Sequence, residues 1–293
     1  MSTSVGLIGC GKMGYGLGRS LLRKNYKLYV FPHHNMTKIN LLKNQGAIVC
    51  ESIRMMTSEC KVILMSLPNV ETIQEIIFGK NGLANFENKQ NIIIDTSTSS
   101  YLATKEICRE LDGIKVKYID APLIGNPIEA EMGKLTTIVG TEQGASKTVD
   151  QIIKSFSKNV IYVGKSGEGQ KLKLLCNFVC MSFALIVEFA LSCRKQINVD
   201  LQQFDRAMSC GTNYVATIPM MLTWLRTKDT NILDFSIKNA AKDLHYFYDM
   251  INNLKNKNEF VSILKLYESV SINEKFKNKT LPFLFVYFQN FEK

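Results

Sequence analysis

The sequence predicts an α/β fold, with a doubly wound and mostly parallel sheet in its first half and an all-helical second half. Three observations support this prediction. Short β-like runs alternate with amphipathic stretches up to Gly164, a glycine-rich turn follows the first run, and no strand-like run appears after Gly164. Strands that alternate with helices form βαβ units, and helices then cover both faces of a parallel sheet.

The expected strands are short, apolar and rich in β-branched residues. They cover residues 5–9, 28–31, 47–50, 62–66, 92–95, 116–119, 135–139 and 160–163. Amphipathic stretches between them, such as 13–24 and 99–111, show the spacing of helices with one buried face. This alternation predicts a Rossmann-type domain over residues 1–164.

The remainder of the chain, residues 165–293, is predicted to be an all-helical domain for substrate binding and dimerisation. The pattern after Gly164 is one of successive helices, with breaks near Asn198, near 211–213 and near 228–231. A helix that starts near Glu168 is expected to join the two domains directly, since no low-complexity linker is present.

Composition excludes several classes of protein. The chain has 293 residues, 46% of them hydrophobic, and a net charge of +10, but its lysines are scattered and no basic run is interleaved with aromatics, so no nucleic-acid partner is expected. Eight cysteines without a CxxC pair and only three histidines indicate no metal site and no disulfide framework. The longest apolar segment, 178–191, is interrupted by Glu188 and is too short to span a bilayer. We therefore expect a soluble, cytoplasmic protein with reduced thiols and no membrane partner.

A glycine-rich turn with the pattern GxGxxG occupies residues 9–14, directly after the first strand and at the start of a helix. In this context Gly9 permits a tight turn, Gly11 lets the backbone approach a pyrophosphate, and Gly14 allows close packing of helix on strand. Lys12 and Met13 complete the turn. The phosphates would bind the amides at the helix N-terminus, so the turn predicts a dinucleotide site.

The end of the second strand indicates which dinucleotide is bound. A carboxylate there usually pairs with the ribose hydroxyls, but this chain has Pro32, His33, His34 and Asn35. The absence of a carboxylate, with His33 and His34 as possible partners for a 2′-phosphate, favours NADP. The alternative is that the histidines merely end the strand and that NAD is also accepted.

Six motifs, in order along the chain, resemble those of the β-hydroxyacid dehydrogenase family, which includes 3-hydroxyisobutyrate dehydrogenases and semialdehyde reductases. They are GLIGCGKMG at 6–14, SLPN at 66–69, DTST at 95–98, the stretch APLIGNP at 121–127 with Ala130, Gly133 and Leu135 in register, GEGQKLKLLCN at 167–177, and Phe235 followed by AKDL at 241–244. The resemblance covers nearly the whole chain and implies an NAD(P)-dependent dehydrogenase or reductase that acts on CH–OH groups.

Lys173 and Asn177 lie four residues apart, and therefore on one face of a helix that is apolar almost all round. A buried lysine has a lowered pKa, which suits a general acid or base. On spacing alone a lysine that reaches the surface at a helix start would be the better explanation. The family resemblance instead makes Lys173 the acid/base and Asn177 the residue that orients the substrate.

The same resemblance assigns further residues. It places Leu67, Pro68, Thr98, Phe235 and Lys242 at the cofactor, and Ser97 at the substrate together with Ile124, Gly125 and Asn126. Two alternatives remain open: Ser97 and Thr98 would equally well cap the helix near Ser99, and Phe235 would equally well be a core residue. Glu188 is expected to be a structural partner in a buried or intersubunit contact.

Ile124-Gly125-Asn126 stands where relatives have Ser-Gly-Gly, and amides around Gly125 and Asn126 would hold the carboxylate of an acid. Loss of a serine hydroxyl alters that grip, so the expected substrate is a small β-hydroxyacid or semialdehyde other than the 3-hydroxyisobutyrate type. The competing hypotheses are a dinucleotide-binding scaffold or sensor without catalysis, and a reductase of a non-carboxylate carbonyl or imine. A homodimer or homotetramer is expected because the apolar helix and an aromatic C-terminal run offer surface to bury.

Overall fold

The computed structural model describes residues 3–32, 36–85, 91–141, 145–211, 214–229, 231–254 and 257–289. The chain forms two compact units, Met1–Lys173 and Leu174–Lys293. Their division falls within a helix, somewhat later than the boundary at 164 expected from the end of the strand pattern. Each unit is described separately below.

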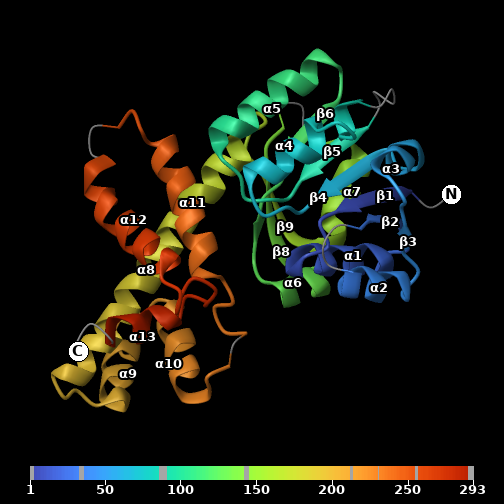
Figure 1. Ribbon diagram of the computed structural model, residues 1–293. Coiled ribbons are helices and arrows are strands. Elements are labelled where there is room, and N and C mark those ends of the chain that lie inside the picture. Colours follow the sequence, from blue (N-terminus) through green and yellow to red (C-terminus); the bar gives the residue numbers. More distant parts are fainter. Residues whose placement is uncertain are drawn as a thin grey trace. The chain divides into compact units, whose positions relative to one another are not determined.

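Unit 1 contains a six-stranded parallel sheet (Figure 1). Its strands are β1 (Ser4–Ile8), β2 (Lys27–Phe31), β3 (Ile48–Val49), β4 (Val62–Met65), β5 (Ile92–Asp95) and β6 (Lys117–Asp120), in the order β3-β2-β1-β4-β5-β6. The order reverses between β1 and β4, which is the point where open α/β sheets bind ligands beyond the carboxyl ends of their strands. The doubly wound fold is confirmed.

Helices cover both faces of this sheet, as Figure 1 shows. One apolar core includes side chains of α1 (Lys12–Arg23), α2 (Met36–Lys43) and α7 (Lys147–Phe156). The other includes side chains of α3 (Ile53–Glu59), α4 (Val70–Phe78) and α5 (Tyr101–Gly113). Because both faces are buried, the strands are mostly apolar rather than alternating, with polar residues at their ends, such as Lys27 and Asp120.

A second, three-stranded sheet was not expected from the sequence. It consists of β7 (Leu123–Ile124), β8 (Leu135–Val139) and β9 (Ser157–Tyr162), with α6 (Pro127–Met132) between its first two strands. The two-residue β7 pairs antiparallel with β8, and β8 pairs parallel with β9. A strand of two residues has too little periodicity to be seen in a sequence.

In its described part, unit 2 is built from helices, with one isolated antiparallel bridge between Ser236 and Thr280. It takes in most of α8 (Glu168–Gln196), which begins in unit 1, and contains α9 (Leu201–Ser209), α10 (Thr217–Thr227), α11 (Ile237–Met250), α12 (Lys257–Ile272) and α13 (Phe283–Gln289). The expected breaks near 198, 211–213 and 228–231 fall between these helices. The aromatic C-terminal run packs into the unit's own core, where Leu284 is fully buried.

The expectation that the apolar segment 178–191 is too short to span a bilayer is wrong, because this segment belongs to a longer apolar helix. The helix α8 is continuous over 29 residues, and the stretch Glu168–Lys195 has the length and composition of a membrane span, with a mean hydropathy of 2.2 in its most apolar window. Within that window 44% of the residues are buried inside the protein. Core helices of soluble proteins pass the same test, so the finding is weak support for a membrane span.

Candidate functional site

Two glycines of the glycine-rich turn are required by the fold, and the third leaves open space for a ligand. Gly9 has φ +95°, and a Cβ there would lie 2.2 Å from the Ser66 carbonyl oxygen, while a Cβ on Gly14 would lie 1.8 Å from the Gly9 carbonyl oxygen. The fold itself therefore requires both glycines. A Cβ on Gly11 would meet nothing within 4 Å. The open space beside Gly11 is what a close approach by a ligand requires.

The first turn of α1 suits an anion. Gly11 is its N-cap, with no side-chain cap hydrogen bond, and no acidic residue stands in the turn. The first N–H groups of the helix therefore face an open N-terminus whose dipole favours negative charge. Lys12, the first helical residue, is exposed and adds a positive charge, and Met13 is half-buried. These residues fit the pyrophosphate of a dinucleotide.

His33 and His34, predicted at the cofactor, lie outside the described residues. Lys38, on α2, is a nearby cation that the structure places at the glycine-rich turn. Its ammonium lies 5.6 Å from the centre of the Tyr15 ring on α1. It also opposes the burial that raises the pKa of the Cys10 thiol to about 11, so it lies within electrostatic reach of the turn.

The loops after β4 and β5 are tied together by Ser97. Its buried hydroxyl accepts a hydrogen bond from the Leu67 amide at 2.8 Å, which fixes Leu67 against the carboxyl end of the sheet, with the exposed Pro68 next to it. The cap of α5 is Ser100, whose hydroxyl accepts from the Ala103 amide. The alternative reading of Ser97 and Thr98 as that cap is therefore wrong.

A fully buried carboxylate, Asp120 at the end of β6, holds the beginning of α8. Its Oδ1 accepts from the Gly167 amide at 2.6 Å and its Oδ2 from the Gln170 amide at 2.9 Å. A Cβ on Gly140 or Gly169 would lie 2.2 or 2.6 Å from these oxygens, so glycines make room for the carboxylate. Burial raises its pKa from 3.8 to about 7, against the two amide hydrogen bonds, which lower it.

Gln170 fixes the same helix to the loop after β5. The side chain is fully buried; its Nε2 donates to the Ser97 carbonyl oxygen at 2.8 Å and its Oε1 accepts from the Ser99 amide at 3.0 Å. Both polar atoms of the amide are thus satisfied by one loop. The first turn of α8 is held at the carboxyl ends of β5 and β6.

Lys173 follows Gln170 by three residues on the same helix. Its side chain is 9% exposed, in contrast to Lys171, which pairs with Glu168 at 2.8 Å near the surface. The expectation of a buried Lys173 is confirmed, and the surface alternative is wrong. Lys173 lies three residues, less than one turn, after Gln170, so the contacts of Gln170 fix its backbone position.

Asn177, Asp243 and Lys242 form a polar cluster in unit 2. The Asn177 amide donates to Asp243 Oδ2 at 2.8 Å, and the Lys242 ammonium lies 2.9 Å from Asp243 Oδ1. Asp243 is 2% exposed and joins α8 to α11. Phe235 is half-buried and packs against the unit's apolar core, which supports its reading as a core residue. None of these contacts involves a residue of unit 1.

The stretch 120–133 contains a turn at Gly125 and the short helix α6, which is capped at both ends. Gly125 has φ +132°, Asn126 is the N-cap of α6, Pro127 is its first residue, and Gly133 ends it in a left-handed conformation. Ile124 is 38% exposed at the end of β7. Pro and Gly thus stand at the two ends where a helix favours them.

The Asn126 amide, expected to hold a substrate carboxylate, donates instead to Glu129 Oε2 at 2.9 Å. The Asn126 side chain in turn accepts from the Glu129 amide at 2.9 Å, which completes a capping box. A Cβ on Gly125 would lie 2.8 Å from the same Glu129 oxygen. The loop therefore already contains a carboxylate of its own.

Four residues with clear structural roles were not singled out as site residues by the sequence: Asp120, Gln170, Asp243 and Glu129. A local signal existed for Glu129 only, because an Asn followed three residues later by Glu is the pattern of a capping box. The partners of the other three are distant in sequence, as with Gln170 and Ser97, which are separated by 73 positions. No group of three metal-binding side chains lies together in the part of the chain that the structure describes.

Comparison with known proteins supports an NAD-binding domain in unit 1. Residues 4–164 match the NAD binding domain of 6-phosphogluconate dehydrogenase. The 2-hydroxy-3-oxopropionate reductase of Escherichia coli is 30% identical over 170 residues, which is 58% of this chain and 58% of that enzyme. The match thus spans somewhat over half of that relative's length.

Solved structures share the whole fold. The crystal structure of 3-hydroxyisobutyrate dehydrogenase from Salmonella typhimurium covers 98% of this chain and all of its own, with a TM-score of 0.83 at 18% identity. Psf3 in complex with NADP+ and 2-OPP covers 97% of this chain and 99% of its own, with a TM-score of 0.83 at 20% identity. The NAD-binding domain, matched over more than half of the chain, and the curated relatives show that the chain belongs to the β-hydroxyacid dehydrogenase family.

Proposed function

We propose that the protein is an NAD(P)-dependent oxidoreductase that interconverts a small β-hydroxyacid and its semialdehyde, with Lys173 as general acid/base. The observation that carries this proposal is the buried Lys173, placed less than one turn from the contacts that fix α8 to the carboxyl ends of β5 and β6. When bound, the nicotinamide would supply or accept the hydride. The chain's own residues would manage the proton.

Lys173 would donate a proton from its ammonium to the carbonyl oxygen in reduction, and its amine would take the proton from the alcohol in oxidation. A fixed backbone position matters here, because a proton donor must lie within hydrogen-bond reach of the reacting oxygen. Asn177 would orient the substrate, and Asp243 would hold the Asn177 amide for that task. By resemblance, Thr98, Phe235 and Lys242 would contact the cofactor and Ser97 the substrate.

Replacement of Lys173 tests the proposal, with Lys171 as a matched control on the same helix. Purified Lys173→Ala protein should lose at least about a hundredfold in kcat, the usual contribution of a general acid/base, while its Kd for NADPH stays within about threefold. Lys171→Ala should keep full turnover. The assay follows cofactor absorbance with glyoxylate, tartronate semialdehyde, succinic semialdehyde and methylmalonate semialdehyde. Full turnover by Lys173→Ala at saturation would refute the assignment.

NADP is the proposed cofactor. Lys38 supports this, since it adds a cation beside the glycine-rich turn, and a 2′-phosphate would gain a charge-assisted contact there. His33 and His34 are proposed as further partners. Lys38→Gln should reduce the preference for NADPH over NADH about tenfold, measured as the ratio of the two Kd values. An unchanged ratio would place the 2′-phosphate elsewhere.

A homodimer or homotetramer is proposed from the surface of α8 in unit 2. Five large apolar side chains along one face of the helix are 42–61% exposed: Leu175, Val179, Phe183, Ile186 and Phe189. A second copy would bury this stripe. Ile186→Glu should shift sedimentation toward the monomer, whereas Lys195→Glu near the end of the same helix should not.

A cytoplasmic location is also proposed for the protein. It is in keeping with the eight free thiols, because cytosolic proteins keep their cysteines reduced.

One observation favours a second candidate, a reductase of a carbonyl without a carboxylate. The Glu129 carboxylate occupies the Asn126 amide and stands beside Gly125, where it would repel a substrate carboxylate. Turnover of neutral aldehydes with no turnover of the four acids would support this candidate. Cofactor binding without turnover of any substrate would instead indicate a scaffold or sensor.

A further inference from the structure

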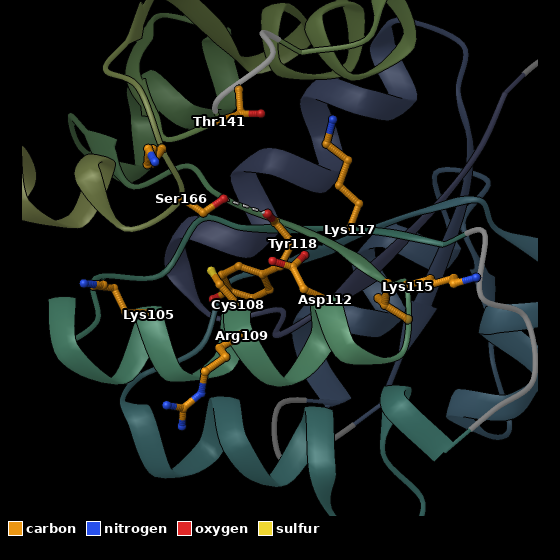
Figure 2. A pocket seen from close by; sticks show the side chains of 11 residues that line it. Lys105, Cys108, Arg109, Asp112, Lys115, Lys117, Tyr118, Thr141 and Ser166 are labelled. Carbon is orange, nitrogen blue, oxygen red and sulfur yellow. Dashed lines mark hydrogen bonds between the residues drawn. The ribbon is translucent and has the colours of Figure 1, made fainter.

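A pocket of about 570 Å³ lies in unit 1, apart from the residues discussed so far. It is bounded by α5, by the beginning of β6, by Thr141 after β8, and by Lys165 and Ser166 before α8. Figure 2 shows Cys108, Asp112, Tyr118 and Ser166 in its middle. Pockets of 300–1,000 Å³ are the size that holds small metabolites.

This pocket is distinct from the dinucleotide site. The glycine-rich turn follows the carboxyl end of β1, near the centre of the sheet, whereas the pocket runs along the amino-terminal half of β6, which is the edge strand. None of the predicted cofactor or substrate residues lines it. A ligand here would leave the nucleotide site free.

The lining is strongly cationic. Five basic side chains and one acidic side chain surround the pocket: Lys105, Arg109, Lys115, Lys117, Lys165 and Asp112. Figure 2 shows four of the bases, Lys105, Arg109, Lys115 and Lys117, reaching outward around the central residues. An excess of four positive charges at one cavity is a large share of the chain's net +10. Such a cluster raises the local concentration of anions.

The charges on α5 are sorted by face. Lys105, Arg109 and Asp112 line the pocket at helical spacing, whereas the acids Glu106 and Glu110 do not. An unsorted surface would mix both signs and cancel much of the field. The Cys108 thiol between these residues has its pKa raised to about 12, mainly by burial, so it stays neutral and adds no negative charge.

Neutral donors lie at the floor of the pocket. Ser166 donates to the Tyr118 carbonyl oxygen at 3.1 Å, so that carbonyl faces the outer edge of β6. The N–H of a strand residue lies on the same edge as its carbonyl, and the Tyr118 amide therefore faces the pocket as well. The buried Thr141 hydroxyl adds a further polar group. Fixed donors of this kind can orient the oxygens of an anion.

We propose that this pocket binds a small polyanion that carries two or more phosphate groups. Lysine ammonium and arginine guanidinium groups are the side chains that recognise phosphate, and a single carboxylate would leave most of the excess charge unpaired. The Tyr118 hydroxyl donates to the buried Asp95 at 2.6 Å, so the ring points inward and offers no face on which a base can stack. Recognition therefore rests on the phosphates.

The test is a calorimetric titration of the full chain with sodium tripolyphosphate and, separately, with ATP at 150 mM salt. Arg109→Gln/Lys117→Gln should weaken tripolyphosphate binding at least tenfold. Asp112→Asn should tighten it about threefold, because it removes the one acid of the lining. The control Lys134→Gln/Lys158→Gln removes two exposed lysines outside the pocket and should change Kd by less than twofold. The Kd for NADPH, measured on each variant, should stay unchanged and reports that the dinucleotide site is intact.

Opposite shifts in the two pocket variants, with a silent control, support the site. ATP that binds no more tightly than tripolyphosphate supports recognition through the phosphates alone. Tighter ATP binding that Arg109→Gln/Lys117→Gln does not weaken would place the nucleotide at another site and would overturn the proposal. Equal weakening in the pocket and control variants would mean that net charge alone attracts the anion, and this would overturn it. So would binding that Arg109→Gln/Lys117→Gln leaves unchanged.

Discussion

The two units treat a buried carboxyl group in opposite ways. In unit 1, Asp120 is fully buried and accepts two backbone amides, from Gly167 and Gln170. In unit 2, Glu188 is equally buried, and neither of its oxygens has a hydrogen-bond partner among the described residues. Burial raises the pKa of both, to about 7 for Asp120 and well above the usual value for Glu188.

The difference shows that the N-terminal end of α8 is fixed by hydrogen bonds to a buried carboxylate, whereas the Glu188 carboxyl group makes none among the described residues. The Asp120 carboxylate gains hydrogen bonds that only its ionised form accepts fully, and these contacts fix the turn that precedes Lys173. Glu188, five turns further along the helix, has no such partners and is best accommodated as the neutral acid. The expectation that Glu188 would be buried is confirmed, but a partner for it is not seen in the described part of the chain.

The largest effect is expected from Asp120→Ala. The change leaves the Gly167 and Gln170 amides buried without an acceptor, at a cost of about 3 kcal/mol in the free energy of unfolding. Because the start of α8 is then loosened, kcat should fall more than cofactor affinity does. Urea denaturation and NADPH titration measure the two effects. Asp150→Ala, which removes a partly exposed acid that pairs with Lys154, is the control and should cost less than about 1 kcal/mol. Equal losses in both variants would mean that Asp120 is not an anchor.

Glu188→Met should act in the opposite direction. Replacing an unpartnered buried acid with an apolar side chain of similar size removes a desolvation cost, and we expect unit 2 to gain about 1–3 kcal/mol. The Tyr267 hydroxyl nearby keeps its own bond to the Met181 carbonyl oxygen and needs no new partner. Thermal unfolding at pH 7 measures the gain. A loss of stability would show that Glu188 has a partner in the assembled protein.

The pH dependence of stability separates the two acids. Each has a higher pKa when folded than when unfolded, so the folded state binds more protons and stability falls as pH rises from about 4. For Asp120 the fall ends near pH 7, and for Glu188 it runs from the usual carboxyl pKa up to the raised pKa that burial gives it. Urea midpoints between pH 4 and 8 should show a flatter slope up to pH 7 in Asp120→Asn, and Glu188→Gln should also flatten the slope above pH 4. Parallel curves for both variants and wild type would contradict this account.

The sequence predicted features that depend on local pattern. The glycine-rich turn, the strands of the parallel sheet and the burial of Lys173 follow from spacing and from the family motifs. Long-range partners could not be predicted, because nothing near Asp120 in the sequence indicates that it will meet Gly167 and Gln170. The two-residue β7 was missed because it is too short to show periodicity. The capping box of Glu129 was missed because the family pattern directed attention to a ligand at that loop, and not to the hydrogen bonds between Asn126 and Glu129.

The smallest expected effect concerns that loop, where the half-buried Glu129 carboxylate lies beside Gly125 and, under the proposed function, would face a substrate held there. Glu129→Gln keeps an oxygen that can accept from the Asn126 amide, so the cap of α6 should survive, but the negative charge is lost. Two like charges about 4 Å apart in water repel each other by about 1 kcal/mol. Without this repulsion, KM for a carboxylate-bearing semialdehyde should fall about fivefold, while KM for a neutral aldehyde stays the same. Glu110→Gln, an equal change of charge on α5, should alter neither. If both substrates respond equally to Glu129→Gln, the residue serves only the helix, and the substrate's acid group lies beyond its reach.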